Sequence, residues 1–191
     1  MAYNMTGLRI ISGDLKGRKL FSIKGLKIRP TSGRLRESIF NILSNQVADS
    51  VVLDLFAGTG ALGIEALSRG ASFAIFIDSD KEAVLTISKN IKVCGLMDRT
   101  TIARFDISNN IIKSAHKLPA ASLVFMDPPY NRNLVTPALI NLSKSRILEN
   151  NASIVIEHDV QETLPENISD YKITDQRRYG KTLVSFLKYM V

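Results

Sequence analysis

The residues best suited to chemistry form the tetrapeptide Asp127-Pro128-Pro129-Tyr130, which follows the apolar run 123–126. The Asp127 carboxylate and the main-chain carbonyl of Pro128 are two acceptors for the N–H groups of an exocyclic nucleobase amine, and they would stabilise the charge that develops on its nitrogen. Pro129 forces extended geometry on Pro128, which holds that carbonyl rigidly, and the Tyr130 ring offers a face for stacking. The tetrapeptide therefore predicts amine activation by position and electrostatics, with a plain two-proline turn as the alternative.

A glycine-rich loop lies upstream of the tetrapeptide. Gly58, Gly60 and Gly63 follow the apolar run 51–55 in the pattern G-x-G-x-x-G, and Asp78 lies 20 residues after Gly58. This spacing is also that of a dinucleotide fingerprint, so a nicotinamide oxidoreductase is a serious alternative. Asp54 counts against it, because a carboxylate there would repel a pyrophosphate and attract the ammonium end of a methionine moiety. The loop therefore favours S-adenosylmethionine.

Other residues are candidates for binding this cofactor by their position. Asp78 can accept hydrogen bonds from both ribose hydroxyls. Asp106 follows the run 101–105 and can accept a hydrogen bond from an adenine amino group, or simply cap the element after it. The predicted cofactor-binding residues are Asp54, Phe56, Gly58, Thr59, Gly60, Asp78 and Asp106.

Lysine and arginine are concentrated near the N-terminus. The 191-residue chain has a formal net charge of +7, and residues 1–36 contain nine basic residues against one acid, so the remainder is close to neutral. The block is interleaved with glycine and apolar residues, which is typical of a folded surface that attracts phosphates. A solvated face without a partner is the alternative.

Composition excludes several other classes of protein. No apolar run approaches the length of a membrane helix, and no secretory leader is visible, so a cytoplasmic protein is expected. A single cysteine, Cys94, rules out an internal disulfide, and with only His116 and His158 beside it no zinc site is expected. Cys94 is most simply a core residue, and a functional role for His158 is the weaker interpretation.

Short apolar runs alternate with helical patterns from residue 50 onward. Strands are expected at 51–55, 73–77, 101–105, 123–126 and 154–157, with helices near 61–69, 81–93 and 134–146. This alternation predicts an α/β fold with a parallel sheet covered on both faces. Residues 171–178 and 182–189 are expected to form an antiparallel pair around the turn 179–181.

The N-terminal region is predicted to be a small extension. Residues 9–11 and 18–21 are expected to be short strands, and a helix capped by Thr31 or Ser32 should follow. Its apolar face would dock on the remainder while Arg34 and Arg36 stay accessible. We therefore divide the chain into a basic extension, residues 1–46, and a catalytic domain, residues 47–191.

With these residues in place, the chain resembles the RsmD family of bacterial 16S rRNA guanine-N2-methyltransferases over essentially its whole length. The glycine loop and the tetrapeptide alone would indicate only an amino-methyltransferase, and the N-terminal segments narrow the resemblance to this family. Gly33 stands where many relatives have Asp, and Asp78 stands where they often have Glu. The matching segments are 9–13, 17–20, 29–31, 34–41, 54–71, 127–130 and 179–180.

The resemblance implies a seven-stranded Rossmann-like methyltransferase sheet with an antiparallel C-terminal hairpin. It further implies transfer of a methyl group from S-adenosylmethionine to N2 of one guanine in 16S rRNA of the small ribosomal subunit. Separately, we expect a monomer that needs no metal. The basic extension would then bind RNA, mainly through phosphates. The predicted RNA-binding residues are Arg9, Lys16, Arg18, Lys19, Arg29, Thr31, Arg34 and Arg36.

Other functions remain open at this point. An amino-methyltransferase acting on DNA, on another RNA base or on a protein release factor would use the same tetrapeptide. Outside that class, the chain could be a basic RNA-binding protein with an inactive fold, or the oxidoreductase considered above.

Overall fold

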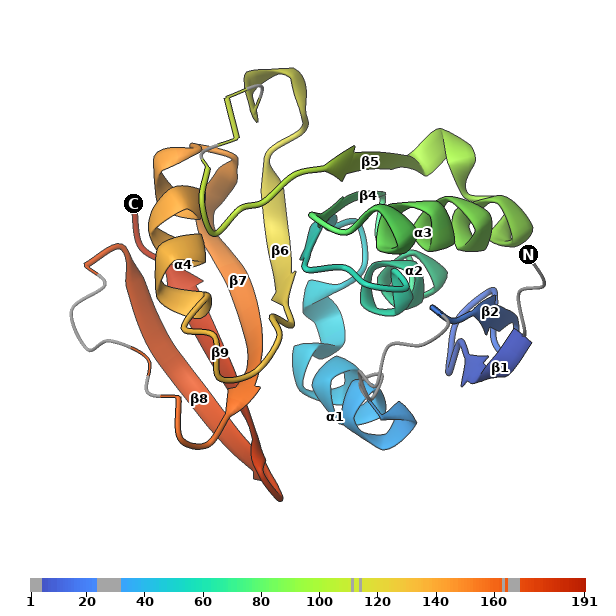
Figure 1. Ribbon diagram of the computed structural model, residues 1–191, viewed down its shortest axis with the longest axis horizontal. Coiled ribbons are helices and arrows are strands. Elements are labelled where there is room, and N and C mark those ends of the chain that lie inside the picture. The colour runs from blue at the N-terminus through green and yellow to red at the C-terminus, as the bar shows by residue number, and fades with distance from the viewer. Residues whose placement is uncertain (1–4, 24–31, 111, 114, 163, 165–168) are drawn as a thin grey trace.

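A mixed β-sheet forms the centre of the molecule. The computed structural model describes residues 5–23, 32–110, 112–113, 115–162, 164 and 169–191. Within them, seven strands make one sheet in the order β5-β4-β3-β6-β7-β9-β8, and only β9 runs antiparallel to its neighbours β7 and β8 (Figure 1). The predicted fold class is therefore confirmed. The strands are β3 (Val51–Leu55), β4 (Phe73–Asp78), β5 (Thr100–Arg104), β6 (Ala121–Met126), β7 (Leu148–Asp159), β8 (Tyr171–Tyr179) and β9 (Thr182–Tyr189).

Helices cover both faces of this sheet because alternate strand residues are apolar on each face. One hydrophobic cluster joins Val52 and Phe125 to α1, α2 and α3, and the other joins Leu53 and Val124 to α4. The expected strand–helix alternation is thus confirmed. The helices are α1 (Gly33–Leu43), α2 (Ala61–Ser68), α3 (Lys81–Cys94) and α4 (Val135–Lys144), with 3-10 turns at Ser44–Gln46, Met97–Arg99 and Ala115–Lys117.

The N-terminal extension is a two-stranded sheet followed by α1. β1 (Met5–Arg9) pairs antiparallel with β2 (Lys19–Phe21), so the first strand lies earlier in the chain than expected. The Ser32 hydroxyl accepts the main-chain N–H of Leu35 at 3.2 Å and caps α1, as the sequence predicted. Thr31, the other candidate for the cap, lies outside the described residues.

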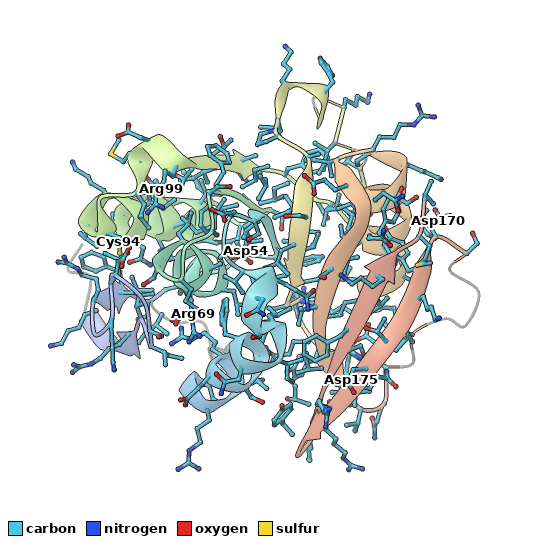
Figure 2. The ribbon with its side chains drawn as sticks, turned by 180° about the vertical axis from the view of Figure 1, so that it is seen from behind. Asp54, Arg69, Cys94, Arg99, Asp170 and Asp175 are labelled. Atoms are coloured by element: carbon cyan, nitrogen blue, oxygen red, sulfur yellow. The ribbon has the colours of Figure 1, made fainter. Side chains whose placement is uncertain are left out.

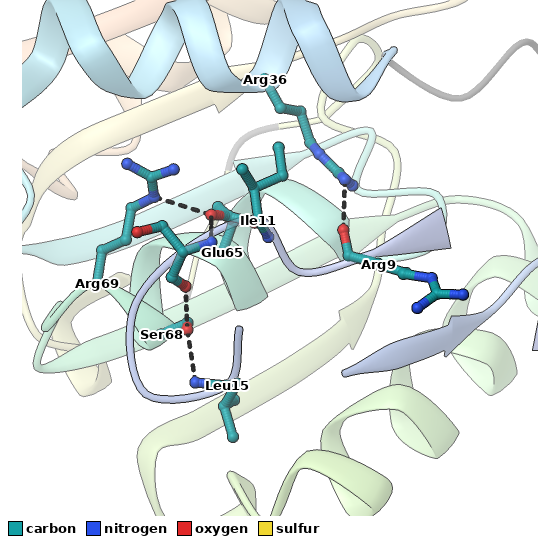
Figure 3. A network of polar contacts seen from close by, with 8 residues as sticks. Arg9, Ile11, Leu15, Arg36, Glu65, Ser68 and Arg69 are labelled. Atoms are coloured by element: carbon teal, nitrogen blue, oxygen red, sulfur yellow. Dashed lines mark hydrogen bonds and ion pairs between the residues drawn. The ribbon is translucent and has the colours of Figure 1, made fainter. Parts of the chain in front are cut away.

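Buried polar side chains of α2 hold the loop between β1 and β2, residues 10–18, against this helix (Figure 3). The Glu65 carboxylate, which is fully buried, accepts the main-chain N–H groups of Ile11 at 2.8 Å and Ser12 at 3.0 Å. Ser68 Oγ donates to the Ser12 carbonyl at 2.6 Å and accepts the N–H of Leu15 at 2.9 Å. Because each of these buried polar groups has a partner, the loop and α2 form one packed unit.

Helix α1 joins the same core. The Phe40 ring packs against Phe125 of β6 at 5.4 Å between centroids, and the Arg69 guanidinium lies 4.6 Å from the Phe40 ring centre. Arg69 Nε also donates to Glu65 Oε1 at 2.8 Å. The extension and the seven-stranded sheet therefore share one hydrophobic core.

The expectation that Arg36 stays accessible is wrong. The side chain is only 2 % exposed, and its Nη2 donates to the Arg9 carbonyl at 2.6 Å (Figure 3). Arg36 follows Leu35 on the buried face of α1, which is wider than the apolar residues alone indicate. Burial lowers the pKa of Arg36, and the nearby Glu65 carboxylate acts in the opposite direction. Arg36 is a buried link between α1 and β1, whereas Arg34 is exposed.

Candidate active site at the carboxyl edge of the sheet

The carboxyl ends of three adjacent strands bring the predicted site residues together. Leu55 of β3 pairs with Ile77 of β4 on one side and with Met126 of β6 on the other. The chain passes from β3 to β4, while β6 adds on the opposite side of β3, so the strand order reverses between β3 and β6. Ligands of open α/β sheets bind at such a reversal. Asp78 and Asp127 therefore flank the segment that leaves β3.

The glycine loop has an unusual backbone conformation. Phe56, Gly58 and Gly60 all have positive φ, at 55°, 56° and 75°. A bulky residue such as Phe56 rarely adopts this conformation, and such strain gathers at functional sites. The Gly58 N–H donates to Asp78 Oδ2 at 2.8 Å, which ties the loop to the end of β4.

A small hollow opens beside this loop. It is a narrow crevice between side chains that encloses no space the size of a water molecule, and both apolar side chains and carboxylates line it. The structure thus places three predicted cofactor-binding residues around one space. The lining residues are Phe56, Ile77, Asp78, Ser79, Phe105, Asp106 and Ile107.

Asp106 also has a local structural role. Its carboxylate accepts the N–H of Ser108 at 3.0 Å and the side-chain amide of Asn109 at 2.7 Å. Hydrogen bonding, above all from the Ser108 side chain, lowers the pKa of Asp106 and keeps it ionised. A charged acceptor therefore stands at the rim of the hollow, although the same carboxylate stabilises the turn after β5.

Asp54 lies in the interior of the sheet (Figure 2), is 2 % exposed and accepts the Gly63 N–H at 2.9 Å. Burial raises the pKa of Asp54 well above its usual value; the Gly63 bond opposes this, and the charges of Asp127 and Asp78 raise the pKa further. The charges of two carboxyl groups, Asp127 and Asp78, thus act on a third, Asp54, at this edge. Such a cluster favours a cationic ligand.

The third glycine of the motif serves packing. A Cβ on Gly63 would lie 2.4 Å from Cε1 of Phe76 and 3.1 Å from Oδ2 of Asp54. A side chain there would displace the Asp54 carboxylate. Gly63 therefore allows α2 to approach β3 and β4 closely, which does not discriminate between nucleotide ligands.

Asn90 of α3 connects the glycine loop to the N-terminal hairpin. Its Nδ2 donates to the carbonyls of Thr59 at 2.8 Å and Phe21 at 3.1 Å, and its Oδ1 accepts the Phe21 N–H at 2.7 Å. The side chain is fully buried. Sequence reasoning missed Asn90, because a polar residue among the apolar positions of a helix gives no indication of a partner 69 residues away.

The tetrapeptide follows β6 directly. Pro128 is buried, Asp127 and Tyr130 are half-buried, and Pro129 is exposed. The Tyr130 hydroxyl donates to Glu157 Oε1 at 2.6 Å. Burial raises the pKa of Tyr130, and the bond to Glu157 raises it further.

A second partner of Tyr130 comes from β9. Thr182 Oγ1 lies 3.1 Å from the Tyr130 hydroxyl. Sequence reasoning placed Glu157 at the end of a strand but gave neither Glu157 nor Thr182 a role. The sequence indicated these two residues only by their positions. Thr182 follows the hairpin turn, and Glu157 belongs to the strand next to β6.

The predicted RNA-binding residues fall into three groups. Arg36 is buried, and Arg29 and Thr31 lie outside the described residues. The others are exposed on β1, on the loop after it, at the start of β2 and on α1. These are Arg9, Lys16, Arg18, Lys19 and Arg34.

His158 and Cys94 both lie inside the protein. His158 is fully buried, with Nδ1 2.9 Å from the Glu162 carbonyl and Nε2 2.8 Å from Ser185 Oγ. It holds β7, β9 and the following turn together. Cys94 is buried in the core, as predicted.

Two structural features are absent from the described part of the chain. No three histidine, cysteine or acidic side chains are grouped there in a way that could hold a metal ion. None of the helices in that part has the length and apolar character required to cross a bilayer.

Comparison with known proteins agrees with this geometry. Residues 8–188 match the family described as Conserved hypothetical protein 95. Ribosomal RNA small subunit methyltransferase D of Escherichia coli K12 is 34 % identical over 174 residues, 91 % of this chain and 86 % of that protein. The protein of the same name from Buchnera aphidicola of Acyrthosiphon pisum is 38 % identical over 172 residues, 87 % of this chain and 88 % of its own.

A solved structure supports the same assignment. An Escherichia coli protein described as a methyltransferase superposes with a TM-score of 0.83 at 31 % identity, covering 95 % of this chain and 97 % of its own. The match extends through the N-terminal extension, the glycine loop and the C-terminal hairpin. The chain therefore belongs to the RsmD family of methyltransferases, which its sequence resembles.

Proposed function

We propose that this protein transfers a methyl group from S-adenosylmethionine to the exocyclic N2 amine of a guanine in 16S rRNA of the small ribosomal subunit. The observation that carries the proposal is the position of residues 127–130 beside the strained glycine loop at one sheet edge. The names of the relatives support the rRNA substrate.

The residues around the glycine loop fit this cofactor. The hollow is lined by apolar side chains that would pack against an adenine ring, and Asp78 lies at its edge for the ribose hydroxyls. The Asp54 carboxyl, in its cluster of acids, would attract the ammonium group. When bound, S-adenosylmethionine supplies an electrophilic methyl group carried by a sulfonium.

The tetrapeptide would activate the amine. A guanine N2 is a poor nucleophile because its lone pair is delocalised into the ring. The Asp127 carboxylate and the Pro128 carbonyl would each accept one N–H, which localises that lone pair and stabilises the positive charge developing on nitrogen. Burial of Pro128 holds its carbonyl in place. The Tyr130 ring would stack on the base, so the target guanine must leave its own stack.

We expect Glu157→Gln and Tyr130→Phe each to lower kcat about tenfold, because the first removes the charge that strengthens the hydrogen bond orienting the Tyr130 ring and the second removes the bond itself. The double variant should be no slower than Tyr130→Phe, since Glu157→Gln then has no Tyr130 hydroxyl to act on. Single-turnover rates at saturating substrate measure this. If the losses in kcat of the two single variants multiply in the double variant, Glu157 acts through a different contact. Unchanged unfolding midpoints of the variants would exclude a general loss of structure.

The exposed cations of the extension provide a docking surface for RNA. Arg18 precedes β2 and Lys19 is its first residue. Asn90 connects this strand to the glycine loop by hydrogen bonds. Phosphates bound by these cations would therefore stand in a fixed position relative to the site. Exposed Arg34 keeps its predicted place in this surface, whereas buried Arg36 is no longer part of it.

The proposal is tested with labelled S-adenosylmethionine and small ribosomal subunits that lack the modification. We expect the label in N2-methylguanosine of 16S rRNA after nuclease digestion. Label in N6-methyladenosine, or only in DNA or protein, would overturn the assignment. Thermal stabilisation by NAD and none by S-adenosylhomocysteine would favour the oxidoreductase instead.

A further inference from the structure

The turn of the β8–β9 hairpin lies at the same sheet edge as the tetrapeptide. Thr182 pairs with Asp159 at the carboxyl end of β7 and with Tyr179 across the hairpin. The same Thr182 contacts the Tyr130 hydroxyl, and the Val160 N–H donates to the Lys181 carbonyl at 3.1 Å. Residues 177–181, which we call the hairpin tip, are therefore fixed next to the catalytic loop. Figure 1 shows this end of the hairpin reaching toward α1.

The hairpin tip is also joined to the N-terminal extension. The hydroxyl groups of Tyr179 and Ser38 form a hydrogen bond between β8 and α1. Arg34 lies one helical turn before Ser38 and on the same side of α1, where it is exposed. The hairpin tip thus continues the basic surface of the N-terminal extension toward the tetrapeptide.

The charge around the hairpin tip is predominantly positive. Arg177, Arg178 and Lys181 are exposed, and Arg178 Nε donates to the Gly180 carbonyl at 3.0 Å, which holds that guanidinium at the turn. Arg177 forms an ion pair with Asp175 at 2.8 Å. The other two cations of the tip, Arg178 and Lys181, take no part in that ion pair.

Neighbouring elements add charges of both signs. Exposed Arg132 follows the tetrapeptide, and α1 contributes Arg34 together with the acid Glu37. Half-buried Asp159 lies at the end of β7. Among the exposed side chains here cations outnumber acids, which is typical of a surface that binds phosphates.

We propose that the hairpin tip forms a second RNA-binding surface, which adjoins Arg34 of the first and holds the phosphates flanking the target guanine. The inference rests on the proposed function. A base that reaches Tyr130 is unstacked, so the phosphates on either side of it pass the mouth of the site. The hairpin tip is anchored to that mouth through Thr182, and its cations are placed to meet them.

The test compares two variants with the same loss of charge. Arg178→Ala/Lys181→Ala removes two cations from the hairpin tip. The matched control, Lys144→Ala/Lys172→Ala, removes exposed cations from the end of α4 and from the other end of β8, near Asp170. Binding to unmodified small subunits is measured over a range of KCl concentrations, together with methylation kinetics and S-adenosylhomocysteine affinity.

For the tip variant we expect Kd and KM to rise about tenfold. The slope of log Kd against log salt should fall by about 1.4, because each of two single-stranded RNA phosphates that the protein no longer neutralises accounts for about 0.7. Its kcat and its affinity for S-adenosylhomocysteine should match the wild type, and the control should keep the wild-type Kd and slope.

Two kinds of failure are distinguishable. If wild-type protein methylates small-subunit RNA but the tip variant and the control have the same Kd and slope, the hairpin tip is not an RNA-binding surface. If wild-type protein does not methylate this RNA, the proposed function itself is wrong.

Discussion

Asp127→Ala should nearly abolish methyl transfer while cofactor affinity stays nearly unchanged. The substitution removes one of the two acceptors for the amine N–H groups, and losing one such electrostatic partner typically slows chemistry about 100- to 1,000-fold. The hollow and the Asp78–Gly58 hydrogen bond do not involve Asp127. Loss of the Asp127 charge should also lower the pKa of Asp54, which favours its ionised form.

Single-turnover methylation and calorimetry with S-adenosylhomocysteine measure the two effects separately. Asp127→Asn serves as the control, because it keeps the shape and one acceptor oxygen but removes the charge, and it should retain more activity than Asp127→Ala. Loss of S-adenosylhomocysteine binding in Asp127→Ala would refute the catalytic role. Full function of that variant would favour an RNA-binding module without activity.

Gly13→Ala should destabilise the protein far more than Gly17→Ala, although the two glycines have nearly the same φ of 79° and 80°. A Cβ at Gly13 would lie 1.7 Å from the Ser68 carbonyl oxygen, whereas a Cβ at Gly17 meets nothing within 4 Å. Gly17→Ala should therefore cost only the backbone strain, about 1–2 kcal/mol. Gly13→Ala adds a clash with the main chain, for a total of about 2–5 kcal/mol.

Urea unfolding of the two variants measures this difference. The clash at Gly13 also threatens the hydrogen bonds from Asp14 N–H to the Ser68 carbonyl and from Leu15 N–H to Ser68 Oγ. We therefore expect a raised KM for RNA in Gly13→Ala, because Lys16 and Arg18 would move with the loop. Equal free energies of unfolding for the two variants would show that the loop is not packed on α2.

Much of the fold follows from local patterns in the sequence. Apolar strands alternating with amphipathic helices predict the parallel sheet, and Gly180 marks the hairpin turn. β7 was predicted too short, at 154–157 instead of Leu148–Asp159. Residues 149–151, near its start, are polar and exposed, so they carry no apolar signal.

The site was predictable in part, because its residues follow strands whose carboxyl ends must meet. Glycine spacing and the tetrapeptide indicate where the backbone turns. Long-range partners were not predictable, and the burial of Arg36 depends on how α1 packs on β1 and α2. The Tyr130–Glu157 hydrogen bond likewise exists only once β6 and β7 are paired.

The attachment of the N-terminal loop has a consequence for how this family can change. Glu65 and Ser68 hold the loop through main-chain atoms of Ile11, Ser12 and Leu15, while side chains 16, 18 and 19 are exposed to solvent. Any residue type supplies the same main-chain N–H and carbonyl groups, proline's missing N–H aside. Selection can therefore rewrite the outward side chains for a different RNA surface while the loop keeps its place, which separates the evolution of recognition from that of stability.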